Sequence, residues 1–130
     1  MLKKIVTIVF LTTAFACTTA EEKLSSALQE KVLKLHDTLM PQTEQLISFK
    51  SSLYSISKGK DSVHIKQIIH ALDQADQSMM EWMHQFSLDS LSKLAVGEKL
   101  TYLQSQYSAL TRLKTSTDSS LHAAKTYLSR

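Results

Sequence analysis

Two histidine–methionine pairs are the side chains with the clearest capacity for chemistry. His36 and Met40 are four residues apart, and Met80 and His84 repeat that spacing in reverse order. A spacing of four places both members of a pair on one face of a helix. Thioether and imidazole groups suit Cu(I), and imidazole also suits Zn²⁺ or Cu²⁺. A histidine and a methionine facing each other across a bundle are also a ligand set for haem iron.

The chain between the two pairs can bring them to one level. In an antiparallel helix pair, residues at the same level have position numbers with a constant sum. The position numbers of His36 and His84 sum to 120, as do those of Met40 and Met80. A turn at Gly59 requires about this sum. We therefore predict these four residues as a candidate copper, zinc or haem site. The alternative is that they are ordinary bundle residues, because methionine commonly fills irregular cores.

No motif of an enzyme accompanies these residues. The chain contains no His-Glu-x-x-His and no Cys-x-x-Cys-His, so zinc-protease and covalent haem chemistry have no support. It has a single Glu-x-x-His, from Glu81 to His84, whereas a di-iron bundle uses one from each of two helices. Serine and threonine are plentiful, but none lies in a nucleophile elbow. We expect no enzymatic activity and no catalytic residues.

The first 17 residues have the layout of a bacterial lipoprotein signal. Met1 to Lys4 is a short basic start, an apolar run follows to Phe15, and Ala16 precedes Cys17, the only cysteine. This order is typical of a secretory signal peptide. We predict cleavage before Cys17 and acylation of its thiol, which would tether the mature chain to a membrane.

Two alternatives remain for this segment. The apolar run is shorter than the roughly 20 residues that a membrane-spanning helix needs, but a retained anchor helix would also place the chain at a membrane. A plain secreted protein, cut near Ala16 or Ala20, would carry no lipid. The residues before Cys17, Ala14 and Phe15, match the usual lipobox only loosely.

Composition argues for one domain without a nucleic-acid partner. The mature chain, Cys17 to Arg130, would have 114 residues, which suits a single domain. The full chain has 15 basic and 12 acidic residues, and loss of Lys3 and Lys4 with the signal leaves 13 against 12. A nearly neutral domain gives no electrostatic reason to bind nucleic acid.

Apolar residues recur at spacings of three and four over three segments, residues 24–56, 65–86 and 100–128, as amphipathic helices require. The chain has two glycines and one proline. We predict an all-α fold, an antiparallel up-down-up three-helix bundle preceded by a signal peptide. A break at Pro41 would make four helices, but the apolar pattern continues through it, which favours a kink. The expected division is a signal peptide at 1–16, a lipidated polar tether at 17–23 and a bundle at 24–130.

Two sequence segments resemble a family. His36-Asp37-x-x-Met40-Pro41 and Ala75-Asp76-x-x-Met79-Met80-x-Trp82-Met83-x-x-Phe86 are similar to segments of small helical lipoproteins of the Bacteroidetes. Some of those are labelled viral A-type inclusion proteins. The resemblance implies a lipid-anchored helical domain at the cell membrane or outer membrane, facing the periplasm or the cell surface. It implies no activity and no catalytic residues.

Together these features predict a membrane-anchored lipoprotein whose helical bundle binds an envelope protein partner or supports the envelope. The alternative is a lipoprotein that binds copper, zinc or haem through His36, Met40, Met80 and His84.

Overall fold

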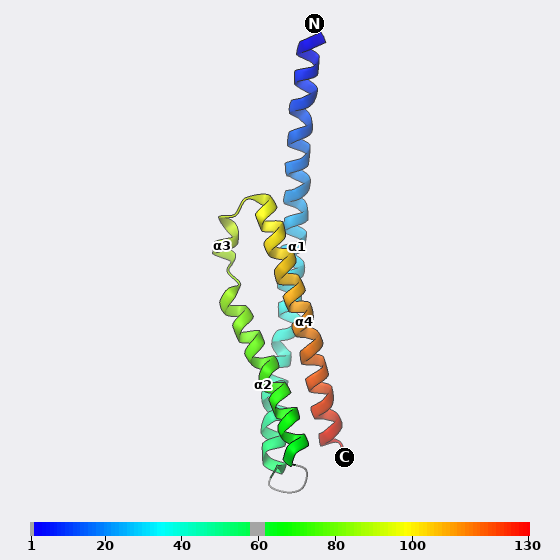
Figure 1. Ribbon diagram of the computed structural model, residues 1–130, viewed down its shortest axis with the longest axis vertical. Coiled ribbons are helices and arrows are strands. Elements are labelled where there is room, and N and C mark those ends of the chain that lie inside the picture. Colours follow the sequence, from blue (N-terminus) through cyan, green and yellow to red (C-terminus); the bar gives the residue numbers. More distant parts are fainter. Residues whose placement is uncertain (1, 58–61) are drawn as a thin grey trace.

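The computed structural model is all-α, with three long helices and one short one (Figure 1). Helices α1 (Leu2–Ile56), α2 (Ser62–Gln85) and α4 (Val96–Leu128) run up, down and up, and α3 (Leu88–Ser92) lies in the connection from α2 to α4. The structure describes the backbone of residues 2–57 and 62–130, and the side chains of residues 19–57 and 63–130. The predicted antiparallel bundle is confirmed, while Gly59, where the turn was predicted, lies outside the described residues.

Helix α1 is uninterrupted at Pro41. A proline in a helix interior removes one backbone hydrogen bond and costs about 3 kcal/mol. Pro41 lies on the exposed side of α1, where water can satisfy the carbonyl that loses its partner. Leu39 and Leu46 on either side are buried in the bundle, and their packing holds the helix together. The predicted alternative of a fourth helix beginning at Pro41 is therefore wrong.

Helix α1 also includes the segment 17–23, which the sequence suggested as a polar tether. These residues are helical and continuous with the bundle. The N-terminal part of α1 projects beyond the other helices (Figure 1). Ser25 is the first buried residue among the described side chains. Ser25 lies eight positions after Cys17. A helix would therefore place the first buried side chain about 12 Å along its axis from the cysteine.

The bundle core follows a strict seven-residue repeat. One set of buried positions recurs in this way on each long helix: Ser25, Val32, Leu39, Leu46 and Leu53 on α1, Ile65, Leu72 and Met79 on α2, and Leu103, Leu110, Thr117 and Ala124 on α4. A repeat of seven keeps one seam of each helix facing its neighbours and is the pattern of a left-handed coiled coil. Packing therefore fixes which side chains of each helix face outward.

A polar layer divides the core into two apolar clusters. One cluster includes Leu46 and Leu121, and the other includes Leu39 and Leu113. Between them lie Gln42 and Thr43 of α1 and Thr117 and Ser120 of α4. The Gln42 side-chain nitrogen donates to Asp118 Oδ1 at 3.0 Å. The Gln42 Oε1, Thr43 Oγ1 and Thr117 Oγ1 atoms are buried and have no hydrogen-bond partner in the described part of the chain.

The Thr117 hydroxyl is buried and has no hydrogen-bond partner in the described part of the chain. Burying a hydroxyl without a partner costs roughly 1–3 kcal/mol. Replacing Thr117 with valine should therefore raise the free energy of unfolding by about 1 kcal/mol, measured by urea denaturation of residues 18–130. Thr126→Val, at an exposed position of the same helix, should change it by less than about 0.5 kcal/mol. A Thr117→Val variant less stable than wild type would show that this hydroxyl has a partner in solution.

The connection between α2 and α4 is ordered by specific caps. The Ser87 hydroxyl accepts a hydrogen bond from the Ser90 backbone N–H at 3.1 Å and caps α3. Glu98 accepts from the Ala95 backbone N–H at 3.0 Å at the start of α4. Leu91 is buried, so the connection closes one end of the apolar cluster that contains Leu39.

Candidate functional site

The seam between α1 and α2 has the register that the sequence predicted. The rings of His36 and Trp82 lie 5.5 Å apart, centroid to centroid. Lys50 Nζ donates to Asp73 Oδ1 at 2.7 Å. The position numbers of these two pairs sum to 118 and 123, close to the predicted 120. Asp73 is partly buried in this ion pair.

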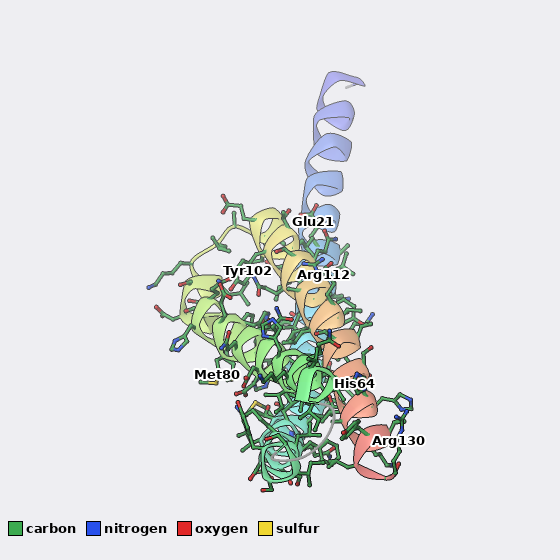
Figure 2. All side chains as sticks on the ribbon, turned by 60° about the horizontal axis from the view of Figure 1, so that its bottom comes forward. Glu21, His64, Met80, Tyr102, Arg112 and Arg130 are labelled. Atoms are coloured by element: carbon green, nitrogen blue, oxygen red, sulfur yellow. The ribbon has the colours of Figure 1, made fainter. Side chains whose placement is uncertain are left out.

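The four predicted metal ligands lie along this seam but face different surroundings. His36 packs on Trp82 and its Nδ1 lies 3.1 Å from Asp37 Oδ1. Met40 and Met80 are 38% and 47% exposed, and Met80 lies at the surface in Figure 2. His84 is exposed.

The ring that His36 contacts belongs to Trp82, and His84 is exposed on α2. Among the described residues, no three His, Cys, Asp or Glu side chains form a group that could hold a metal ion. The four-residue site stays a prediction.

The methionines are concentrated at one level of the seam. Apart from Met1, the chain has Met40, Met79, Met80 and Met83, and the predicted register places all four within one helical turn of the level shared by Met40 and Met80. Met79 is buried and Met83 is half-buried against the core. Met40 and Met80 extend this cluster to the surface.

Aromatic rings continue from His36 into the connection. Trp82 stacks on Phe86 at 4.8 Å between centroids, and Phe86 stacks on Tyr102 of α4 at 6.1 Å. The Tyr102 hydroxyl accepts from the Ser87 backbone N–H at 3.4 Å. Beside this row lies an apolar hollow of about 320 Å³, lined by Leu33, His36, Trp82, Met83, Phe86 and Leu88.

The outer edge of the same seam carries half-buried and exposed apolar side chains at seven-residue spacing. Leu33, Met40, Ile47 and Tyr54 of α1, here called the α1 stripe, follow the buried positions of that helix by one residue. Ile47 and Tyr54 are more than half exposed, at 52% and 53%. Sequence reasoning identified Met40 but missed the rest. Its signal, a second seven-residue repeat beside the core repeat, is present in the sequence.

Two ion pairs near the polar layer and the seam have shifted pKa values. The hydrogen bond to Asp73 raises the pKa of Lys50 above its ordinary value, against the opposing effect of burial. A hydrogen bond from Lys114 lowers the pKa of Asp118, burial opposes this, and a second hydrogen bond from Gln42 lowers it further. Asp118 therefore joins α4 to α1 through a charged side chain.

The shifted pKa of Asp118 predicts a pH dependence. Because its pKa is lower in the folded than in the unfolded chain, its stabilising contribution is present above the ordinary value of 3.8. That contribution is lost as the pH falls through the lower folded pKa. The Asp118→Asn variant should be less stable than wild type near pH 6, by under about 1 kcal/mol because the pair is exposed. Urea denaturation should show this difference shrinking towards pH 3, whereas a constant difference would contradict the assignment.

Cys17 lies within the helical backbone of α1, and its side chain is outside the described residues. Lipidation of Cys17 is therefore still a prediction. Over the part of the chain that the structure describes, no helix combines the length and apolarity needed to cross a membrane.

Comparisons with known proteins give no match. No protein-family model matches the chain, and searches among curated proteins and among solved structures also return no match.

Proposed function

We propose that this chain is a lipid-anchored, non-enzymatic helical bundle that holds an envelope protein partner against the α1 stripe. The observation that carries the proposal is the stripe itself, four apolar side chains repeated every seven residues outside the core. Exposed apolar surface costs solubility, and contiguous apolar patches commonly mark interaction sites.

The stripe suits an amphipathic helix as the partner's contact. A helix presents side chains to a neighbour at alternating spacings of three and four residues, which add up to the seven-residue spacing of the stripe. Met40 on α1 and Met80 on α2 lie at about the same level of the bundle. Methionine side chains adapt to varied partner surfaces. The hollow at Leu33 and Met83 would accept one bulky side chain of that helix.

The anchor follows from the sequence. Cleavage before Cys17 and acylation of its thiol would attach α1 directly to the membrane, because α1 is helical from that residue into the bundle. Two or three acyl chains hold a protein stably at a membrane, whereas one does so only marginally. The stripe would then be presented close to the membrane surface.

Affinity capture from solubilised membranes tests the proposal. Tagged full-length protein should recover a partner that the Ile47→Lys variant does not. Leu24→Lys is the matched control, because Leu24 is apolar, 56% exposed and on the same helix, but lies about 140° around it from the stripe. Equal recovery by all three proteins would show that the partner binds elsewhere, and no specific recovery would count against partner binding.

The second candidate function is metal or haem binding, favoured by the gathering of Met40, Met79, Met80 and Met83 near His36. Thioethers select Cu(I). Under reducing conditions, Cu(I) at 100 times its dissociation constant should stabilise the protein by about 2.7 kcal/mol, and Met40→Leu with Met80→Leu should remove that shift. Zn²⁺, Cu²⁺ and haem are the comparison ligands. The absence of any thermal shift would exclude this function.

A further inference from the structure

The surface between α2 and α4 carries a long groove that the α1 stripe does not line. Two adjoining hollows of about 400 and 630 Å³ lie between α2 and α4 and share Ser78, Glu81 and Ser116. Their walls are mostly small side chains, among them Ala75, Ala109 and Ser120. The groove is therefore open enough to admit a ligand. Small side chains alone do not identify one.

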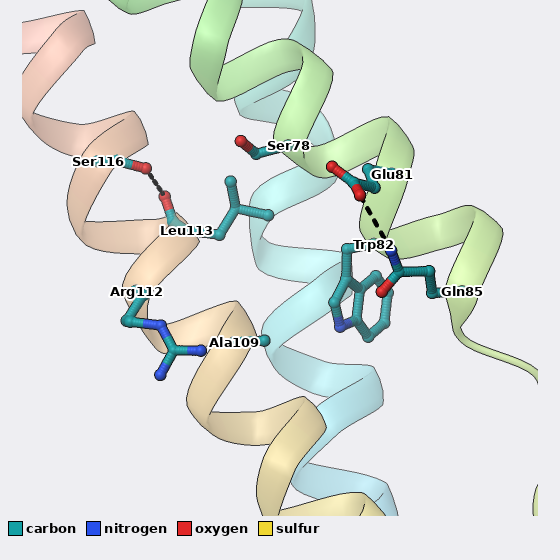
Figure 3. Close-up of a pocket in the computed structure, with 8 residues that line it drawn as sticks. All are labelled: Ser78, Glu81, Trp82, Gln85, Ala109, Arg112, Leu113 and Ser116. Atoms are coloured by element: carbon teal, nitrogen blue, oxygen red, sulfur yellow. Dashed lines mark hydrogen bonds between the residues drawn. The ribbon is translucent and has the colours of Figure 1, made fainter.

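Trp82 lines this groove and has a buried hydrogen-bond donor. Its side chain is 7% exposed, and its indole Nε1–H has no hydrogen-bond partner among the described residues. A buried donor without an acceptor costs about 1–3 kcal/mol. Figure 3 shows the indole nitrogen on the side of the ring that faces α4, towards Ala109 and Arg112. The groove thus contains a donor that lacks an acceptor.

Arg112 supplies a second donor on the facing wall. Its guanidinium donates once, from Nη1 to Ser108 Oγ at 2.9 Å, and it belongs to none of the ion pairs in the described part of the chain. A guanidinium carries five N–H donors in a planar fork that matches a carboxylate. A carboxylate between the two helices could accept from Arg112 with one oxygen and from Trp82 with the other.

Glu81 restricts the charge that a ligand of this groove can carry. It lies on the α2 wall of the groove and accepts one hydrogen bond, from Gln85 Nε2 at 3.0 Å (Figure 3). It too has no cationic partner in the described residues. A ligand with only a negative charge would be repelled by Glu81. A ligand that carries an ammonium group as well as a carboxylate complements both walls.

We propose that the groove between α2 and α4 binds zwitterionic amino compounds, namely free amino acids or short peptides. The carboxylate is held by Arg112 and the Trp82 N–H, and the ammonium group by Glu81. Because the Trp82 nitrogen has almost no accessible surface, binding requires side chains around it to move and admit the carboxylate. This site is independent of the α1 stripe, so either proposal can fail alone.

Trp82 is the only tryptophan, so its fluorescence reports binding directly. Full-length protein in mild detergent is titrated with the dipeptide alanyl-alanine, with sodium acetate and with ethylammonium chloride at constant ionic strength. We expect a saturable change with the dipeptide, at least tenfold weaker binding of acetate, and no response to ethylammonium.

Substitutions test which side chain binds the carboxylate and which binds the ammonium group of the ligand. Arg112→Gln should weaken dipeptide binding at least tenfold, and Glu81→Gln should remove the preference for dipeptide over acetate. Both residues are exposed, so neither change should unfold the bundle, which circular dichroism checks. Arg130→Gln, at the exposed C-terminus, is the control and should bind as wild type does. No saturable response to the dipeptide, or full binding by Arg112→Gln, would overturn the proposal.

Discussion

Replacing Leu110 with alanine should lower the free energy of unfolding by about 2–5 kcal/mol, the range for a fully buried leucine. Leu110 has no exposed surface and belongs to the cluster that also contains Leu39 and Trp82. It lies in the seven-residue repeat of α4, where it packs at the axis of the bundle. A domain of this size is stable by only about 5–15 kcal/mol, so the loss is a large fraction of the total.

Urea denaturation of residues 18–130 measures this effect, since every described buried side chain lies within that range. Leu24→Ala provides the matched control, because Leu24 is 56% exposed and its truncation should cost less than about 0.5 kcal/mol. Similar losses in the two variants would mean that α4 does not pack at the axis as described.

Replacing Cys17 with serine should remove the protein from the membrane or leave it unprocessed. The thiol of Cys17 is the only one in the chain, and no described helix is suited to cross a membrane. Each buried methylene of an acyl chain contributes about 0.8 kcal/mol of membrane affinity, so losing two or three chains is a large change. The nearly neutral mature domain offers no electrostatic substitute.

Fractionation of cells expressing wild type and Cys17→Ser measures this, with mass spectrometry of the N-terminus to report cleavage. A chain that begins at residue 18 marks the mobility of the processed, unlipidated form. Membrane retention of Cys17→Ser after cleavage at the normal place would refute the lipid anchor. Wild type lacking a lipid adduct would refute it as well.

Much of the fold follows from local patterns in the sequence. Spacings of three and four predicted the long helices, and Gly59 predicted the register that His36 with Trp82 and Lys50 with Asp73 confirm. The continuity of α1 through Pro41 was also predictable, because apolar residues on both sides keep their phase. These features depend on periodicity along one helix, which a single sequence displays.

Other features depend on how helices pack against each other. Whether His36 meets His84 or Trp82 depends on side-chain length and rotation, so the predicted ligand set was not resolved by register alone. The polar layer at Thr43 and Thr117 appears only when α1 and α4 are placed side by side. The groove beside Trp82 likewise arises from small residues on two helices that are about 35 positions apart in the sequence.

Site-specific photo-cross-linking tests the central claim, that the α1 stripe holds a partner at the membrane. A photoreactive phenylalanine analogue is placed at Ile47 and, in a separate protein, at Leu24, and intact cells are irradiated. Both side chains are about half exposed on α1, so they differ mainly in the face from which they project. We expect a discrete adduct of one partner mass from position 47 and none from position 24. Equal adducts from both positions, or no adduct from position 47, would contradict it.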